Sequence, residues 1–316
     1  MPLVVRSLTL ESAGVLAVEL VDPAGRELPA WEPGAHLDLR LPDAMSRQYS
    51  LCGDPADRSR YRLGVLREES GRGGSAYVHD VLRPGDHVDY AGPRNHFRLE
   101  PAGSYVFVAG GIGITPILPM LAEATAAGAA WTLLYGGRTA ASMAFTGELA
   151  GYGDRVTLWP QDTHGLLDLD ALLETPRADT LVYACGPAPL LAAVEARVAA
   201  AWPAGALRLE RFAAPVVERD PAAEQAVGHA VELVLADSGR TVLVPPDRSI
   251  LDVLDEEGVE VLSDCREGIC GTCEVKVIEG EVDHRDHVLS APERRANSCM
   301  MVCVSRACGT RLVLGV

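Results

Sequence analysis

The chain has 316 residues, which is long enough for two or three domains with separate buried cores. Its net charge of −16 argues against nucleic acid as a partner, because phosphate binding needs a basic face. Glycine and proline interrupt the longest apolar runs, so we predict no membrane-spanning helix and no membrane partner.

The start of the chain and its cysteine content predict an intracellular protein. The first residues, MPLVVRSLTLESAGVL, lack an apolar core followed by a small-residue cleavage site, so we expect no secretion signal and a cytoplasmic location. Thiols stay reduced in the cytosol, and eight cysteines are too few for a disulfide scaffold in a chain of this length. The cysteines therefore need another explanation than disulfide bonds.

Residues 1–101 carry short strand-like runs separated by turns. These runs read GVLAVELV, AHLDLRL, RQYSLC, YRLGVLRE and DHVDYAGP. Alternation of apolar and polar residues with period two, at this spacing, predicts an antiparallel β-barrel.

Residues 102–214 have a different pattern. Apolar strands, SYVFVAGG, WTLLYGG, RVTLWP and TLVYACGP, alternate with the helical stretches TPILPMLAEATAAG and APLLAAVEARVAAAW. This order is typical of a doubly wound α/β domain with a parallel sheet.

The remainder of the chain predicts a linker and a third domain. Residues 215–227 are rich in Pro, Ala and charge without periodicity, which predicts a linker. Residues 228–316 begin with the strand-like runs AVELVLA and TVLVPP and the helix candidate SILDVLDEEG. A cysteine-rich segment follows this helix.

Three cysteines of that segment, Cys265, Cys270 and Cys273, form the pattern C-x4-C-x2-C, and Cys303 follows thirty positions later. This is the spacing of a plant-type [2Fe–2S] ferredoxin. Structural zinc sites usually combine two C-x2-C pairs or add histidines, whereas here there is one C-x2-C pair and no histidine between Cys265 and Cys273. Cys299 is an alternative fourth ligand, although the thirty-position offset favours Cys303.

Glycines lie between the cysteines of this pattern. Thiolates concentrate negative charge, which backbone N–H groups must stabilise. Gly268 and Gly271 let the backbone curl around the cluster, because glycine tolerates positive φ and has no Cβ.

A glycine turn in the middle segment predicts a nucleotide site. The stretch VFVAGGIGITPILPML reads as a strand, a turn and a helix opened by Thr115 and Pro116. Gly110, Gly111 and Gly113 would let a pyrophosphate approach the backbone at the N-terminus of the helix. The turn departs from the G-x-G-x-x-G dinucleotide pattern, and plain packing is an alternative explanation.

A second element supports the nucleotide site. Cys185, Gly186 and Pro187 follow the strand LVYA, at the carboxyl edge of the predicted sheet. Ligands of open α/β sheets bind at this edge.

The barrel segment carries candidate anion and ring sites. Arg47, Tyr49 and Ser50 belong to one strand, where arginine suits a phosphate and tyrosine can stack on a flat ring. A glycine-rich stretch later precedes a helix-like run, which predicts a second anion site at a helix N-terminus. The residues of that site are Gly73, Gly74 and Ser75.

These motifs, taken together in this order, resemble the phthalate dioxygenase reductase family, and vanillate O-demethylase reductases are similar too. The motifs are RQYSL, GRGGS, GGIGITP, YACGP, ERF and CREGICGTC with CVSRA. Members of the family are three-domain reductases of the ferredoxin–NADP reductase superfamily with a fused plant-type ferredoxin domain. The resemblance therefore implies a flavin-binding barrel, an NAD(H)-binding α/β domain and a β-grasp ferredoxin domain. It also implies that VDHRDHVLS shapes the fold near the cluster.

The resemblance implies a role for individual residues. Tyr49 would lie against the isoalloxazine, Ser50 near its N5, Thr115 at the flavin–nicotinamide junction and Cys185 beside the nicotinamide; Ser50, Thr115 and Cys185 would thus be the catalytic positions. Phe212 would pack by the isoalloxazine. The other residues expected to bind flavin or nucleotide are Arg47, Gly64, Val65, Leu66, Gly73, Gly74, Ser75, Gly111, Gly113, Pro116, Arg138, Gly186 and Pro187.

The family uses FMN, with FAD as the alternative, and prefers NADH. NADPH-dependent relatives gather cationic or hydroxyl groups around the 2′-phosphate. Arg138, Thr139 and Ser142 could form such a group, so NADPH stays the alternative coenzyme.

The resemblance also implies a reaction and a partner. A hydride would pass from NADH to the flavin, and single electrons would leave through the cluster to a Rieske-type terminal oxygenase or O-demethylase. Residues 228–316 contain 16 acidic and 9 basic side chains, a net of −7, which would steer the domain to a basic patch. A cytochrome P450 acceptor, a stand-alone flavoreductase and a ferredoxin-like carrier are the alternatives. We expect a monomer.

Overall fold

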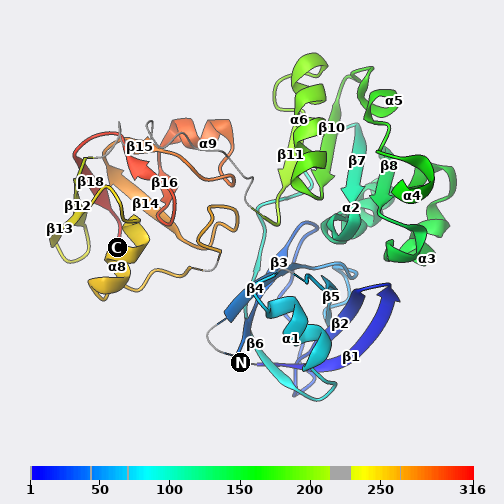
Figure 1. Cartoon of the computed structure of the whole chain (residues 1–316), viewed down its shortest axis with the longest axis horizontal. Helices are drawn as coiled ribbons and strands as arrows, with labels where there is room; N and C mark the ends of the chain where they lie inside the picture. The colour runs from blue at the N-terminus through cyan, green and yellow to red at the C-terminus, as the bar shows by residue number, and fades with distance from the viewer. Residues whose placement is uncertain (1, 43–44, 70, 214–228, 264) are drawn as a thin grey trace. The chain divides into compact units, whose positions relative to one another are not determined.

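The computed structural model describes residues 2–42, 45–69, 71–213, 229–263 and 265–316. The chain divides into two compact units, Met1–Phe212 and Ala213–Val316, and each is described by itself (Figure 1). The linker predicted at 215–227 lies outside the described residues. In the described ranges, none of the helices has the length and apolar character needed to cross a membrane.

An antiparallel β-barrel forms the first part of the first unit and confirms the prediction. Its strands run in the order β4-β3-β6-β1-β2-β5, and a bridge between Leu51 and Leu63 joins the two ends. Leucine and valine side chains such as Leu37 and Leu39 fill the barrel. The strands are β1 (Leu3–Ser12), β2 (Val15–Val21), β3 (His36–Leu41), β4 (Met45–Ser50), β5 (Tyr61–Leu66) and β6 (His87–Arg94).

One helix covers the barrel beside β4 and β5 (Figure 1). This is α1 (Gly74–Asp80), which begins after Gly73, a residue with φ of 85°. His79 of α1 forms a hydrogen bond with the carbonyl oxygen of Val65 at 2.9 Å, which fixes the helix to β5.

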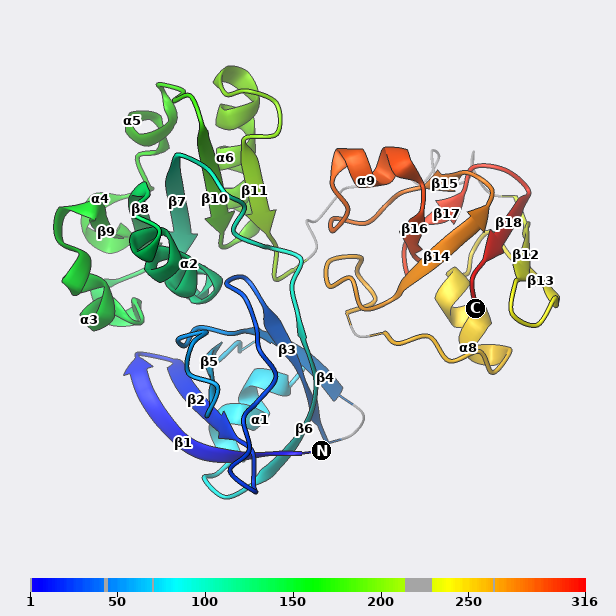
Figure 2. The same ribbon diagram turned by 180° about the vertical axis from the view of Figure 1, so that it is seen from behind.

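A doubly wound α/β sheet forms the rest of the first unit, again as predicted. All strand pairs are parallel, in the order β11-β10-β7-β8-β9. Phe107 and Ala109 of β7 pack on the α2 side of the sheet, whereas Val106 and Val108 pack on the side of α5 and α6 (Figure 2). The strands are β7 (Ser104–Gly110), β8 (Ala130–Gly137), β9 (Val156–Pro160), β10 (Thr180–Cys185) and β11 (Leu207–Glu210).

Two long helices of this sheet match the prediction, and several short ones add to it. The helix α2 begins at Ile114, one residue before the predicted start. The helices are α2 (Ile114–Ala126), α3 (Thr146–Leu149), α4 (Gln161–His164), α5 (Leu169–Leu173) and α6 (Ala188–Ala201), with 3-10 turns η1 (Gly111–Gly113), η2 (Ala140–Ser142) and η3 (Ala150–Arg155).

The second unit is an α+β fold around a mixed sheet. The main sheet has the order β13-β12-β18-β14-β16, with β12 and β18 parallel and the other pairs antiparallel. Ser249 caps α8 by accepting a hydrogen bond from the N–H of Asp252, so the predicted helix begins where the capping residue stands. The elements are β12 (Val231–Leu235), β13 (Thr241–Val244), α8 (Ile250–Glu256), β14 (Glu274–Glu279), β15 (Val282–Asp283), α9 (Ala291–Ala296), β16 (Cys299–Met301), β17 (Arg306–Ala307) and β18 (Arg311–Leu314).

Candidate redox and nucleotide sites

The four predicted cluster ligands lie buried in the second unit as two pairs of thiols. The sulfur atoms of Cys273 and Cys303 are 3.1 Å apart. Cys265 and Cys270 share a side-chain hydrogen bond. A [2Fe–2S] cluster needs two protein ligands for each iron, so an arrangement of two pairs suits it.

The thiol protons are shared unequally within each pair. The hydrogen bond from Cys265 lowers the pKa of Cys270 to about 5, and the same bond raises the pKa of Cys265. The hydrogen bond from Cys303 likewise lowers the pKa of Cys273 and raises that of Cys303. The pairing therefore makes one thiol of each pair easier to deprotonate than the other, and thiolates are the species that bind iron.

The alternative fourth ligand lies outside the two thiol pairs. Cys299, the alternative ligand, lies on β16 opposite Lys276 and is only partly buried. The residues present thus fit a two-iron cluster held by Cys265, Cys270, Cys273 and Cys303.

The backbone of the cysteine loop curls as its glycines allow. Arg266, Gly268 and Gly271 have φ of 55°, 69° and 72°. The N–H of Glu267 donates to the sulfur of Cys265 at 3.3 Å. Because positive φ turns successive N–H groups to the inside of the curl, the loop can stabilise concentrated negative charge.

The segment HRDHVLS packs directly against this loop. The N–H of His287 donates to the carbonyl oxygen of Gly268 at 2.7 Å. A Cβ at position 268 would lie 2.5 Å from Cγ2 of Val304 and 3.2 Å from Cα of Asp286. The carboxylate of Asp286 accepts the N–H groups of Val288 and Leu289, which holds the segment in its turn.

The two predicted nucleotide motifs meet at the carboxyl edge of the parallel sheet. Strands β7 and β10 are parallel neighbours there. After β7 the chain adds β8 and β9 on one side of it, and then β10 and β11 on the other side. A Cβ at Gly113 would overlap with the carbonyl of Cys185, and one at Gly186 would lie 3.0 Å from Cα of Gly110. Gly111 has φ of 55° with open space around it. Ligands bind at such a topological switch point.

The glycines of this turn therefore have different tasks. Gly113 allows close packing of the turn on the end of β10, whereas Gly111 leaves its surroundings accessible. Pro116 lies in the first turn of α2, and Pro187 precedes α6 as its capping residue. The motifs GGIGITP and YACGP, which the sequence analysis predicted to bind nucleotide, thus lie at one edge of the sheet.

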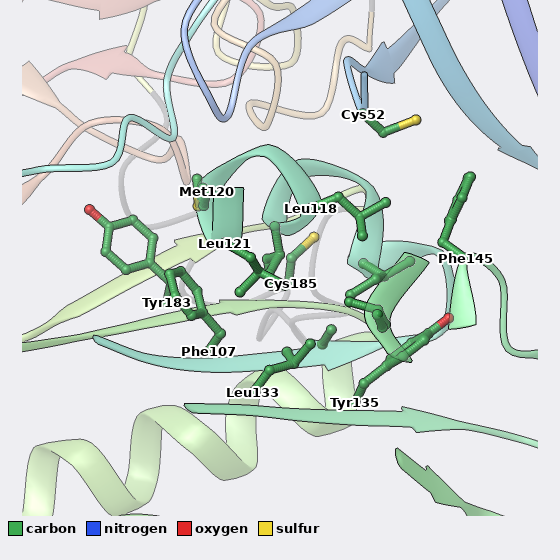
Figure 3. Close-up of a cluster of buried hydrophobic side chains, with 14 of the residues drawn as sticks. Cys52, Phe107, Leu118, Met120, Leu121, Leu133, Tyr135, Phe145, Tyr183 and Cys185 are labelled. Carbon is green, nitrogen blue, oxygen red and sulfur yellow. The ribbon is translucent and has the colours of Figure 1, made fainter. Parts of the chain in front are cut away.

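Thr115 and Cys185 are fully enclosed by the first unit. Thr115 is 1% exposed, and its hydroxyl donates to the carbonyl of Ile112 at 2.9 Å. Cys185 lies among the apolar side chains between α2 and the sheet (Figure 3). Burial raises the pKa of the Cys185 thiol, so it carries no charge at neutral pH.

Glu210 is a neighbour of Cys185 that sequence reasoning missed. The two residues pair in register across β10 and β11, and the Cys185 sulfur lies 4.0 Å from Oε2 of Glu210. Burial raises the pKa of Glu210 to about 8. Its motif, ERF, drew attention only to Phe212, which is 45% exposed. A titratable acid at the carboxyl edge of a strand was the signal that could have identified it.

The predicted flavin residues of the barrel come together at the start of α1. The Arg47 guanidinium donates to the carbonyl oxygens of Ser46 and Arg72 at 2.6 and 2.7 Å. A Cβ at Gly74 would overlap with the Arg47 side chain. The hydroxyl of Ser75 accepts the N–H of Glu68 at 3.0 Å. An arginine lying across a glycine-rich helix start is a suitable cradle for a phosphate.

The remaining flavin candidates lie along β4 and β5. Ser50 is buried opposite His36, whereas Tyr49 keeps partial exposure beside the barrel core. A Cβ at Gly64 would lie 2.6 Å from Cγ2 of Thr115, so the barrel and the nucleotide segment touch at this glycine. Leu66 ends β5 opposite Val15.

Two of the three residues that could hold the 2′-phosphate of NADPH form hydrogen bonds within their own turn. Thr139 and Ser142 form a reciprocal capping box at η2, with each side chain bonded to the backbone of the other. Arg138 has an exposed side chain, and its carbonyl accepts the N–H of Asp162 at 3.1 Å. Ser142 thus uses its hydroxyl hydrogen locally, which weakens the three residues as a site for a 2′-phosphate and favours NADH.

Comparisons with known proteins agree with this division of sites. Residues 107–196 match the family described as "Oxidoreductase NAD-binding domain", and residues 233–308 match "2Fe-2S iron-sulfur cluster binding domain". The phenoxybenzoate dioxygenase subunit beta of Ectopseudomonas oleovorans is 44% identical, over 95% of this chain and 92% of that protein.

Solved structures match the whole chain as well. The crystal structure of phthalate dioxygenase reductase is 35% identical with a TM-score of 0.72, and the match covers 100% of this chain and 98% of that one. An intact type IV self-sufficient cytochrome P450 monooxygenase is 44% identical over 100% of this chain, with a TM-score of 0.94. This chain spans only 41% of that P450 chain.

Proposed function

This chain belongs to the phthalate dioxygenase reductase family, and from this premise we propose that it is the NADH-dependent reductase component of a two-component oxygenase system. The family binds FMN, NADH and a [2Fe–2S] cluster. When bound, FMN accepts two electrons together and releases them singly, and the cluster carries one electron at a time. One observation carries the proposal. The same chain has a glycine turn at the carboxyl edge of a parallel sheet, where nucleotides bind, and two buried pairs of thiols that suit a cluster.

In the barrel, we assign the flavin phosphate to Arg47 with Gly73, Gly74 and Ser75. The contact between Arg47 and the start of α1 supports this assignment. Tyr49 would stack on the isoalloxazine, and Ser50 would lie near its N5. Gly64, Val65 and Leu66 would offer backbone groups to the pyrimidine side.

At the sheet edge, we assign the pyrophosphate of NADH to the turn at Gly111 and Gly113 with Pro116. The nicotinamide would lie beside Cys185, with Thr115 at its junction with the flavin. The contact of Thr115 with Gly64 supports a junction between the two cofactors at this point, since it is where the two segments touch. The chain's task is to hold the reacting groups at close range, because hydride transfer needs no side-chain base.

Other assignments complete the proposed coenzyme sites. Gly186 and Pro187 would border the nicotinamide, Arg138 the adenosine end, and Phe212 the isoalloxazine. We also infer domain boundaries of 1–101, 102–214 and 228–316, with a linker between the last two. The matched ranges 107–196 and 233–308 fall inside two of these segments, which supports the boundaries.

For the electron acceptor, we propose a Rieske-type terminal oxygenase or O-demethylase. The similarity to a dioxygenase subunit and to phthalate dioxygenase reductase supports it. A cytochrome P450 is the second candidate, supported by the 44% identity to part of a self-sufficient P450 chain. We place the protein in the cytoplasm as a monomer, because eight cysteines are too few for a disulfide scaffold in a chain of 316 residues.

An anaerobic absorption spectrum before and after addition of NADH tests the reductase assignment. We expect flavin and cluster bands in the isolated protein, both bleached by NADH. Cluster absorption without flavin would instead support a ferredoxin-like carrier. Failure of NADH to bleach either band would contradict the nucleotide assignment.

Turnover with purified acceptors then identifies the partner class. NADH oxidation should be coupled to product formation when a Rieske-type oxygenase is added, and a P450 domain serves as the competing acceptor. Equal NADH oxidation with ferric iron or a quinone, and no coupling to either oxygenase, would favour a stand-alone flavoreductase.

A further inference from the structure

Phe145 has a backbone conformation that bulky residues rarely adopt. Its φ of 61° and ψ of 17° lie in the left-handed region, where the Cβ crowds the following carbonyl. The side chain is 2% exposed. Its carbonyl oxygen accepts the N–H groups of Glu148 and Leu149 at 3.1 and 3.2 Å, so the residue opens α3. Strained residues persist where their surroundings hold them, often at functional sites.

The ring of Phe145 lies where the barrel touches the nucleotide-binding segment. A Cβ at Gly64 would lie 3.1 Å from two ring atoms of Phe145 and 2.6 Å from Cγ2 of Thr115. The ring extends from its backbone toward the barrel strands and Cys52 (Figure 3). Gly64 and Thr115 are the residues assigned above to the two sides of the cofactor junction. Phe145 therefore lies against Gly64, beside the point where Gly64 meets Thr115.

Arg62 connects this ring to the barrel. It precedes Gly64 by two positions on β5 and so shares its face of the strand. Its guanidinium lies 4.9 Å from the centroid of the Phe145 ring, a cation–π contact. The same group pairs with Glu11 of β1 at 2.8 Å and with Glu148 of α3 at 2.6 Å. Arg62 thus links its own strand, β5, to β1, to the Phe145 ring and to α3.

Further contacts hold the same boundary. The N–H of Ala13 donates to the carbonyl of Ala141 at 3.0 Å, and the Ser12 hydroxyl donates to the carbonyl of Ser142 at 3.3 Å. These bonds join the β1–β2 turn to η2, just before Phe145. They restrain the backbones of the β1–β2 turn and η2, whereas the Phe145 ring lies beside the contact between Gly64 and Thr115.

We propose that Phe145 is a positioning residue for hydride transfer and that Arg62 holds it in place. The proposal rests on the reductase function proposed above. The ring supports Gly64 of β5, which would carry the flavin, at the point where it meets Thr115 of α2, which would face the nicotinamide. A misplacement of about 1 Å can slow such a reaction on the order of a hundredfold.

The test is anaerobic stopped-flow reduction of the bound flavin over a series of NADH concentrations. In Phe145→Leu, which keeps an apolar side chain but is smaller, we expect the limiting rate per bound flavin to fall about tenfold or more. The NADH dissociation constant should change by less than about twofold, because the substitution leaves the turn at Gly111 and Gly113, which would bind the pyrophosphate, unchanged in sequence. Arg62→Gln, with the ring intact, should show a smaller loss of limiting rate. Arg62→Lys, which keeps the charge, should recover part of it.

Leu173→Val provides the matched control. Leu173 is buried on the opposite face of the parallel sheet, so the change removes packing from the same unit without touching the boundary. Its melting temperature should fall while its limiting rate stays at the wild-type value.

An unchanged limiting rate, within about twofold, in flavin-loaded Phe145→Leu would overturn the proposal. So would an equal loss in the Leu173→Val control. If Phe145→Leu does not fold, an unchanged rate in Arg62→Gln overturns it instead. Failure of NADH to reduce the wild-type flavin is a separate result, which would refute the proposed function rather than the role of Phe145.

Discussion

At the scale of single residues, two glycines of the nucleotide turn are required for different reasons, one for close packing and the other for its backbone conformation. Gly113 faces the carbonyl of Cys185 with no room for a Cβ, whereas Gly111 has open space but a φ of 55°. A substitution at either position is therefore unfavourable for a different physical reason.

The pair Gly113→Ala and Gly111→Ala tests this difference. Gly113→Ala should lower the free energy of unfolding by about 1–3 kcal/mol through overpacking and should weaken NADH binding, because the end of β10 must shift. Gly111→Ala should cost only about 1–2 kcal/mol of backbone strain. Chemical denaturation and NADH titration measure both effects. Gly111→Ala should also weaken NADH binding, because its Cβ would enter the open space assigned to the pyrophosphate. Unchanged NADH binding in Gly111→Ala would contradict that assignment.

Glu210 gives the stability of the protein a dependence on pH. Burial raises its pKa from 4.5 to about 8 in the folded state. Between these two pH values the folded state holds a proton on Glu210 that the unfolded state has lost. The contribution of Glu210 to the free energy of unfolding is therefore complete below pH 4.5 and is lost as the pH rises to about 8. Glu210 keeps some solvent exposure, so the effect will be smaller than the full pKa difference implies.

The variant Glu210→Gln should remove this contribution. Between pH 5 and 8, wild-type protein should lose on the order of 1–3 kcal/mol more of its free energy of unfolding than the variant does. Urea denaturation at a series of pH values provides the measurement. Parallel pH profiles for the two proteins would show that the Glu210 carboxyl titrates normally.

At the scale of elements, the cysteine loop and the turn between β16 and β17 together supply the four predicted cluster ligands. The loop supplies Cys265, Cys270 and Cys273 within nine positions, and the turn after β16 supplies Cys303. Cys303 meets Cys273 because β14 and β16 pair in register next to both residues. The fourth ligand thus depends on a strand pairing.

Serine substitutions distinguish the candidate fourth ligands. Cys303→Ser should lose most of the iron and acid-labile sulfide, since it removes one member of a thiol pair. Cys299→Ser should retain both, because Cys299 lies on β16 opposite Lys276 and outside the two pairs. Iron and sulfide analysis of protein purified without air provides the measurement. Full cluster content in Cys303→Ser would exclude it as a ligand.

At the scale of the whole molecule, charge is the property that bears on partners. The chain carries −16, and residues 228–316 contribute −7 of that charge. An acidic protein attracts basic acceptors over distances comparable to the Debye length, and added salt screens the attraction.

Two artificial acceptors test this charge effect. NADH-driven reduction of cytochrome c, a basic protein, should slow as NaCl rises from about 50 to about 500 mM. Reduction of ferricyanide, an anion, should not slow, since screening removes repulsion rather than attraction. A cytochrome c rate that does not respond to salt would show that the acidic residues of the second unit serve solubility alone.

The fold could be predicted well where local pattern and tertiary environment agree. Strands of the parallel sheet are buried on both faces and read as continuous apolar runs, as β7 does. β1 was missed because register shifts after Val5 and Leu10 break its alternation. The helices α3, α4 and α5 have four or five residues, too few for a helical period to appear in the sequence.

The sequence alone determined the cluster type and the order of the domains, because loop spacing, glycine positions and hydrophobic period are local properties of the chain. Only the tertiary structure decided which other distant residues meet: Cys185 with Glu210, and Gly64 with Thr115 and Phe145. These contacts depend on sheet order and on the packing of one segment against another. No local pattern of residues encodes them.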